Sequence, residues 1–242
     1  MLTITRKPIV KAIIDQCIDL YRKEGLVTLT NAVHLKLLSC KIKFPLLEYA
    51  ASQLHEQLTE DDQLLFCDQI ENYKTIGGNV LLGIILQKRL VLNFQESIDK
   101  ASEYISKANA WYVCDIMGER VLGVSLLLSP QKTLLVFENL SQHDSQWVVR
   151  SLGAGAHYAI KKGLDKKSVV QLFLLLLSLG NSKNKEIKQG IGWAAKTTAK
   201  FHPEIITNFK AEIENTEKVG QWFRGKVKIG LNRNLYAQRN KR

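Results

Sequence analysis

Residues 45–58 read PLLEYAASQLHEQL, and this stretch decides the fold class. Its apolar residues recur at steps of three and four positions, which places them on one face of an α-helix. The same period continues along the chain, interrupted only by four prolines, whereas alternating strand patterns are scarce. We therefore predict an all-α chain of about a dozen helices joined by short loops.

Capping residues and glycines mark the expected helix boundaries. Side chains of Ser, Thr and Asn accept hydrogen bonds from the free N–H groups of a first turn, and glycine commonly follows a last turn. The predicted starts follow Thr59, Asn93, Ser129 and Ser182. The predicted stops fall at Gly77-Gly78, Gly163 and Gly180-Asn181.

The composition favours an anionic partner. The chain of 242 residues is 45% hydrophobic, which is ordinary for a globular protein. It carries 34 Lys and Arg against 23 Asp and Glu, a formal charge of +11. Nucleic acid, an anionic membrane surface or an acidic protein would each complement this charge.

Export and membrane insertion are not expected. The first residues lack the apolar core and the small-residue cleavage site of a secretory signal. The most apolar stretch, 169–179, is well short of the ~20 residues that span a bilayer. Four scattered cysteines form no Cys-x-x-Cys pair, so we predict reduced core thiols, no metal and a cytoplasmic protein.

Three tryptophan-centred segments suggest a repeat. Trp147 follows Trp111 by 36 residues, and Trp193 follows Trp147 by 46 residues. These spacings bracket the ~40 to 47 residues of armadillo and HEAT repeats. We predict a single domain over residues 1–242, a HEAT/armadillo-like helical-repeat solenoid with a concave basic groove. An irregular helical bundle is the alternative.

Each segment also pairs a tryptophan with a charged residue three or four positions away, on one helical face. The pairs are Trp111 with Asp115, Trp147 with Arg150, and Trp193 with Lys196. An aromatic face attracts cations, a carboxylate stabilises positive charge, and a basic side chain neutralises phosphate. A site with all three suits a cationic lesion in DNA.

Residues 109–115 (NAWYVCD), 147–153 (WVVRSLG) and 187–204 (IKQGIGWAAKTTAKFHPE) together resemble the HEAT-like DNA alkylation-repair glycosylases. The last run is the most specific, because that family has a Gly-Trp-Ala core, a following basic residue and a later Pro-Glu or Pro-Asp. The resemblance covers roughly residues 80–205. Gln189 departs from the pattern, since a lysine usually precedes this core, and Lys188 lies one position earlier.

The resemblance implies an enzyme that excises N3- and N7-alkylated purines from duplex DNA without a metal or organic cofactor. Asp115 matches the catalytic carboxylate, and Trp111 and Trp193 match the tryptophans that pack against the damaged nucleotide. Arg150 matches a basic residue beside the DNA backbone. With it we group Lys188, Lys196 and Arg224 as predicted DNA-binding residues.

The chemistry is consistent with these roles. An alkylated purine already carries positive charge and leaves without a general acid. The sugar gains oxocarbenium character, which a nearby carboxylate stabilises electrostatically. Asp115 is the acidic residue at the right offset from a tryptophan, and it is also suited to orient the attacking water.

Plainer interpretations stay open for each residue. Trp111, Trp147 and Trp193 are also explained as core aromatics, and Asp115 as an ion-pair partner of Arg120 or Lys107. The alternative for the whole chain is a non-catalytic HEAT-like scaffold that binds nucleic acid or protein. The tail, residues 219–242, has seven basic residues and no acidic one. It either tracks a phosphate backbone or is a mobile solubilising end.

Overall fold

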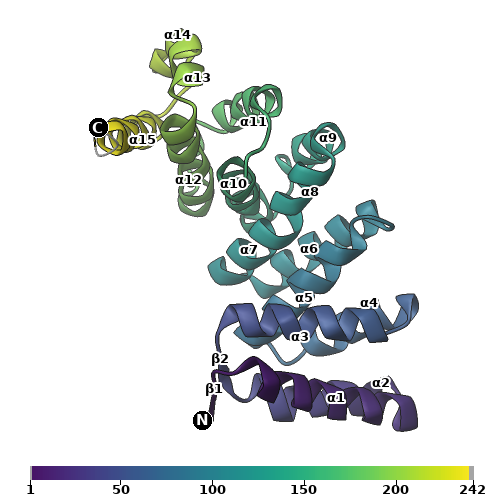
Figure 1. Cartoon of the computed structure of the whole chain (residues 1–242). Coiled ribbons are helices and arrows are strands. Elements are labelled where there is room, and N and C mark those ends of the chain that lie inside the picture. The colour runs from purple at the N-terminus through teal and green to yellow at the C-terminus, as the bar shows by residue number, and fades with distance from the viewer. Residues whose placement is uncertain (1, 240–242) are drawn as a thin grey trace. The chain divides into compact units, whose positions relative to one another are not determined.

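Helix α3 spans Phe44–Gln57 and has Pro45 in its first turn, where the missing N–H removes no helical hydrogen bond. In this computed structural model, which describes residues 2–239, almost every element is likewise an α-helix (Figure 1). The predicted all-α fold is confirmed. The exceptions among the described residues are two π-helical segments and two short strands, β1 (Thr3–Ile4) and β2 (Lys41–Ile42), which pair in parallel.

The chain divides into two compact units, residues 1–104 and 105–242. In the first unit, α1, α3 and α5 pack in one layer, and α2 and α4 pack beside them in a second (Figure 1). Each helix buries its apolar face between these layers. The other bounds in this unit are α1 (Lys7–Glu24), α2 (Leu26–Val33), the π-helical turn η1 (His34–Leu38), α4 (Glu60–Glu71) and α5 (Ile76–Arg89); α6 (Phe94–Ala108) crosses the division.

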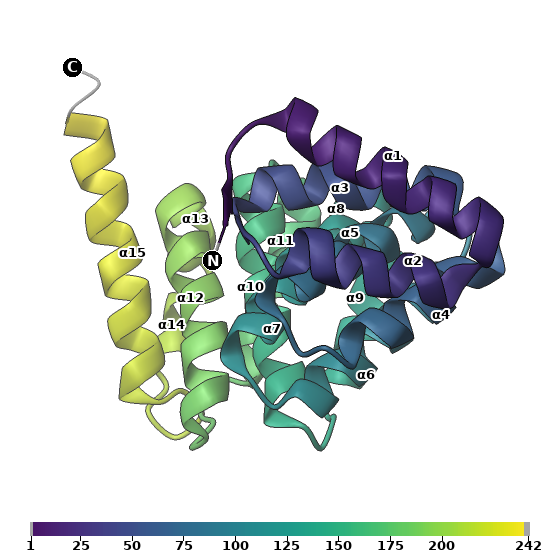
Figure 2. The same cartoon turned by 90° about the horizontal axis from the view of Figure 1, so that it is seen from below.

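The second unit repeats the two-layer arrangement of helical pairs. One layer contains the consecutive segments α7, η2 and α8, followed by α10, α12 and α15 (Figure 2). The other layer contains α9, α11 and the short helices α13 and α14. The bounds are α7 (Trp111–Met117), the π-helical η2 (Gly118–Leu122), α8 (Gly123–Leu128), α9 (Pro130–Leu140), α10 (Gln146–Lys161), α11 (Lys166–Ser178), α12 (Lys185–Phe201), α13 (Pro203–Asn208), α14 (Lys210–Glu214) and α15 (Gln221–Arg239).

Several predicted boundaries are confirmed and two are wrong. Thr59 caps α4, and Gly163, with φ of 96°, follows the end of α10. Gly77 and Gly78 do not end a helix, because the Thr75 side chain caps α5 and places both glycines in its first turn. Ser182 does not start α12, since the Asn184 side chain accepts the first free N–H groups instead.

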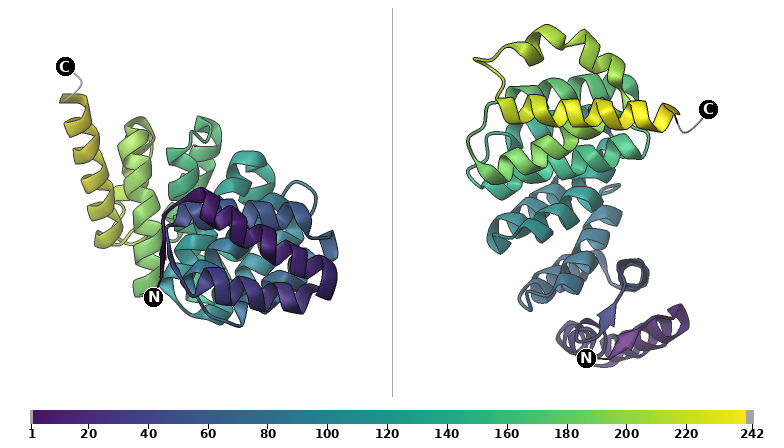
Figure 3. Two further views of the ribbon diagram at one scale, coloured as in Figure 1. Left: turned by 60° about the horizontal axis from the view of Figure 1, so that its bottom comes forward. Right: turned by 90° about the vertical axis from the view of Figure 1, so that its left-hand side faces the viewer.

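The basic tail is helical up to Arg239. Helix α15 packs along α12 (Figure 3), and a methyl group on Gly230 would overlap the carbonyl group of Lys196. Lys241 and Arg242 lie outside the described residues. The prediction of one domain over residues 1–242 stays a prediction.

Candidate active site

Glycines allow three helices of the second unit to approach closely. A methyl group on Gly118, at the start of η2, would lie 2.7 Å from Cβ of Ala154 and 2.9 Å from the carbonyl oxygen of Ser151 on α10. Gly153 of α10 crosses Gly190 of α12 so tightly that any side chain would overlap the opposite backbone. Side chains about one turn before these glycines on α7, α10 and α12 are therefore brought together.

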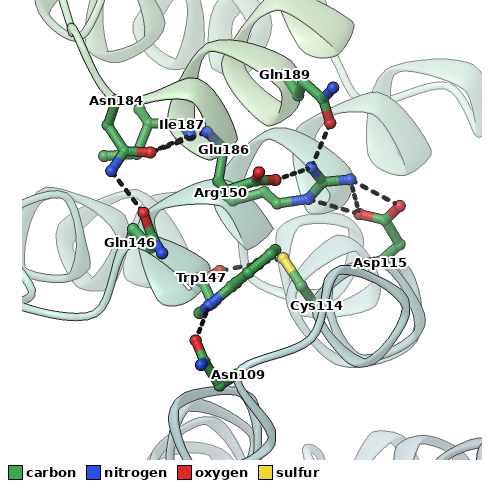
Figure 4. Close-up of polar contacts among 10 residues, drawn as sticks. All are labelled: Asn109, Cys114, Asp115, Gln146, Trp147, Arg150, Asn184, Glu186, Ile187 and Gln189. Atoms are coloured by element: carbon green, nitrogen blue, oxygen red, sulfur yellow. Dashed lines mark hydrogen bonds and ion pairs between the residues drawn. The ribbon is translucent and has the colours of Figure 1, made fainter.

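Arg150 of α10 lies at the centre of this cluster (Figure 4). Its Nε and Nη2 donate hydrogen bonds to the Asp115 carboxylate of α7 at 3.2 to 3.3 Å. Its Nη1 donates to Glu186 Oε2 at 3.0 Å and to Gln189 Oε1 at 2.8 Å, both on α12. A guanidinium group has five N–H bonds, and these contacts involve all three of its nitrogens. The contact of Arg150 with the DNA backbone stays a prediction.

The cluster has an excess of negative charge. The Arg150 side chain is 7% exposed, whereas those of Asp115 and Glu186 are 21% and 20% exposed. Two carboxylates share one guanidinium, which gives the three side chains a formal charge of −1. Partial burial raises the pKa of Asp115; Arg150 opposes this rise and Glu186 adds to it.

Trp147 supports the guanidinium from within α10. Its ring centre lies 6.0 Å from Arg150 Cζ, and its indole N–H donates to Asn109 Oδ1 (Figure 4). The Cys114 thiol donates to the carbonyl oxygen of Trp147 at 3.1 Å. The first two contacts hold the indole ring and the third holds its backbone, which is consistent with the interpretation of Trp147 as a structural aromatic.

Trp111 and Asp115 share a face of α7, four residues apart. Trp111 is 58% exposed, so its ring is available to a ligand. Its contact within the protein is the edge of Tyr112, with ring centres 6.0 Å apart. An exposed indole beside a partly buried carboxylate is the combination predicted from the sequence.

Trp193 belongs to the third tryptophan-centred segment, most of which forms α12. It stands in the middle of α12, one turn beyond Gln189, and stacks on His157 with ring centres 4.0 Å apart. The Thr197 hydroxyl donates to the Trp193 carbonyl oxygen, so it accepts from His157 Nδ1 at 2.6 Å. Burial lowers the pKa of His157 to about 4, with Lys161 and Lys196 adding to the shift, so the imidazole is neutral near pH 7.

The predicted DNA-binding lysines and Arg224 do not join the Asp115 cluster. Lys188 and Lys196 lie on α12 and Arg224 on α15, each partly exposed. The side chains of Lys188 and Arg224 form no hydrogen bond or ion pair with the described residues. Burial lowers the pKa of Lys196, and the nearby cations Arg233 and Lys226 lower it further. The α12–α15 surface therefore concentrates positive charge.

Sequence reasoning missed Glu186 as a partner of Arg150 and treated Gln189 only as a departure from a family pattern. A usable signal was present: Asp115 precedes Arg150 by 35 residues, and Glu186 follows it by 36. Equal spacing in a stacked repeat puts three side chains in one row. The tryptophans do not follow this register, so they obscured it.

Within residues 2–239, no group of three or more His, Cys, Asp or Glu side chains is arranged to hold a metal ion. Three of the four thiols are buried as predicted, and Cys40 is half-buried. None of the helices in the described part of the chain is long and apolar enough to span a bilayer.

Comparison with known proteins gives one match. The model of the DNA alkylation repair enzyme family matches residues 42–220, which extends well beyond the segments that carry the resemblance. Neither the curated proteins nor the solved structures include a match to this chain. The family match includes Trp111, Asp115, Arg150 and Trp193, and it ends just before α15. Because the matched segment covers most of the sequence, the chain belongs to the DNA alkylation repair enzyme family.

Proposed function

We propose that this protein is a DNA glycosylase that hydrolyses the N-glycosidic bond of N3- and N7-alkylated purines in duplex DNA. The observation that carries the proposal is the partly exposed Asp115 carboxylate beside the exposed Trp111, in a cluster of net charge −1. A positively charged alkylated base and the developing sugar cation are both complementary to this charge. The family membership supports alkylated DNA as the substrate.

In the proposed reaction the bond between C1′ and the purine nitrogen breaks, and its electron pair neutralises the cationic base. Asp115 stabilises the oxocarbenium-like sugar and orients a water molecule whose oxygen attacks C1′. The water proton passes to solvent or to the carboxylate. Arg150 is a positioning residue, because its bonds to Asp115 fix the carboxylate in place. Trp111 contributes about 0.5 to 2 kcal/mol as a cation–π partner.

DNA binding is assigned to the basic surface on α12 and α15. Lys188, Lys196 and Arg224 are proposed phosphate contacts, together with Lys226 and Arg233, whose charges act on Lys196. Trp193 lies on the same helix, between Lys188 and Lys196, and is proposed to pack against a nucleotide near the lesion. Helix α15 lies outside the family match, so the proposed role of Arg224 rests on the basic surface and not on the family membership.

A non-catalytic DNA-binding scaffold is the second candidate. It is favoured by the bidentate pairing of Asp115 with Arg150, which cancels part of the negative charge that catalysis requires. The two candidates share the same basic surface and differ only in base release.

The test is to incubate the full chain with duplex DNA that contains N7-methylguanine and to measure free base and alkali-labile sites. Asp115→Asn should lower the excision rate by on the order of 10²- to 10³-fold and leave DNA affinity intact. Asp144→Asn, at an exposed acid of the same unit, is the matched control and should retain full activity.

Salt-sensitive DNA binding without base release by the wild type would support the scaffold. An absence of salt-sensitive binding would reject both candidates, because phosphate contacts release counterions in proportion to their number.

A further inference from the structure

Two carboxylates from different helices converge on one guanidinium in this cluster. Asp115 takes three hydrogen bonds from Arg150, and Glu186 takes one at 3.0 Å from the opposite end of the group (Figure 4). The Asn184 side chain accepts the N–H of Glu186 at 2.9 Å, and Asn184 Nδ2 in turn donates to Gln146 of α10. This hydrogen bond from the Glu186 backbone N–H to the capping Asn184 side chain fixes Glu186 in the first turn of α12.

The second carboxylate is not needed to neutralise the charge of Arg150, although it accepts one hydrogen bond from Nη1. A single Asp–Arg pair is formally neutral, and Gln189 already occupies the remaining end of Nη1 without adding charge. Glu186 adds a negative charge to this neutral pair and gives the cluster a formal charge of −1. Its side chain is 20% exposed. A surplus acid destabilises a partly buried cluster unless a cation is bound there.

We propose that Glu186 is a positioning and specificity-determining residue that offsets the charge of Arg150, so that Asp115 presents an effective negative charge to a cationic alkylated base. This inference rests on the proposed glycosylase function. It identifies the positive charge of the lesion, rather than its shape, as the feature that the cluster recognises.

The charged groups acting on Asp115 are Arg150 from α10 and Glu186 from α12. The neighbouring Cys114 thiol remains neutral because burial raises its pKa. Removal of the Glu186 charge should therefore lower the pKa of the Asp115 carboxyl group and weaken its negative field at the sugar. A role for Glu186 in packing alone predicts neither change.

The experiment compares Glu186→Gln with Gln189→Ala, which removes the neutral partner of the same Nη1. Glu186→Gln should lower excision of N7-methylguanine by on the order of tenfold. It should also move the acid limb of the pH–rate profile to lower pH. Gln189→Ala should leave the acid limb of the pH–rate profile at nearly the same pH. Glu186→Asp keeps the charge and should retain most of the wild-type rate.

A second readout does not depend on catalysis. Carbon-13 NMR of the Asp115 carboxyl group should show a lower pKa in Glu186→Gln than in the wild type, and circular dichroism should show equal folding. An unchanged Asp115 titration in the folded variant would overturn the inference. If the titration moves but the wild type excises nothing, the glycosylase proposal fails while the charge coupling stands.

Discussion

Each unit of this protein contains a nearly buried arginine, and the two are used differently. Arg89 of the first unit donates to the Glu60 carbonyl oxygen and to Gln63, both at 2.8 Å, and to the Glu96 carboxylate at 2.7 Å. Arg150 of the second unit donates only to side chains, and two of those are carboxylates. Both arginines hold together three helices.

The difference lies in the acids. Glu96 is a single partner and its side chain is 50% exposed, so the Arg89 cluster is neutral and mostly structural. Asp115 and Glu186 are two partners and are each about one-fifth exposed. A protein that needs only a helix clamp gains nothing from the second acid, since surplus buried charge destabilises the fold. The excess charge in the second unit is therefore best explained by a ligand.

The two units also differ in how closely their helices pack. In the first unit the closest neighbour of a methyl group on Gly77 would be the end of the Leu38 side chain, at 3.1 Å, which is a tight contact but not one with a backbone. In the second unit Gly153 and Gly190 bring two helix backbones into direct contact. That contact lets Glu186 of α12 reach Arg150, as the close approach of Gly118 to α10 does for Asp115 of α7.

The largest expected effect comes from removing each arginine. Arg150→Met should cost about 3 to 5 kcal/mol of unfolding free energy at pH 7, because it leaves two partly buried carboxylates without a counter-charge. Arg89→Met should cost less, about 1 to 3 kcal/mol, because Glu96 returns to solvent and mainly neutral acceptors lose a donor. Urea unfolding of both variants measures the two losses.

The pH dependence separates the two clusters further. The loss in Arg150→Met should shrink as the pH falls through the titration of Asp115, whose pKa burial raises, since protonation removes the unpaired charge of that carboxylate. The loss in Arg89→Met should vary less over the same range. Equal pH dependence in the two variants would contradict the contrast between a neutral and an anionic cluster.

The next effect concerns the backbone contact. Gly190→Ala should destabilise the protein by about 1 to 3 kcal/mol, because the added methyl group overlaps the Arg150 backbone and forces α10 and α12 apart. It should also lower excision by displacing Glu186 and Gln189 from Arg150. Thermal or urea unfolding and the excision assay measure both consequences.

Gly225→Ala is the matched control. It lies in α15, and a methyl group there would have no neighbour within 4 Å. Alanine in place of this exposed helical glycine should stabilise the protein by about 0.5 to 1 kcal/mol. A Gly190→Ala variant that gains stability in the same way would show that the close contact is not required.

The sequence predicts the helical architecture and part of the site. The three- and four-residue period identifies the buried face of each helix, as in Leu47, Ala50 and Leu54 of α3. The offset of four between Trp111 and Asp115 places both on one face of α7, as the structure has them. These features depend on one helix at a time, which is why a pattern along the chain reveals them.

The contacts between side chains on different helices cannot be predicted from such a pattern. Periodicity shows which face of a helix points inward, but the depth at which two helices cross depends on their contact residues. Here the crossing is set by Gly118, Gly153 and Gly190 rather than by the tryptophans. The partners of Arg150 follow from that register, so the sequence analysis missed Glu186.

The last prediction concerns His157, which stacks on Trp193 in the second unit. His157 has a pKa lowered from 6.5 to about 4, so the folded protein binds fewer protons there than the unfolded chain. Stability from this group is complete above pH 6.5 and is lost as the pH falls from 6.5 to 4. The slope from one proton is at most about 1.4 kcal/mol per pH unit. Urea unfolding between pH 4 and 7 should show this loss in the wild type.

His157→Gln removes the titrating group, so its unfolding free energy should vary less with pH over that window. Thr197→Val removes the hydrogen-bond partner of Nδ1 but keeps the imidazole and its burial, so most of the pH dependence should persist. If the wild type and His157→Gln lose stability in parallel, the imidazole is not held neutral by its burial against Trp193. The loss at low pH would then have to arise from a group other than Asp115, because burial raises the pKa of that carboxyl group and its protonation favours the folded protein as the pH falls.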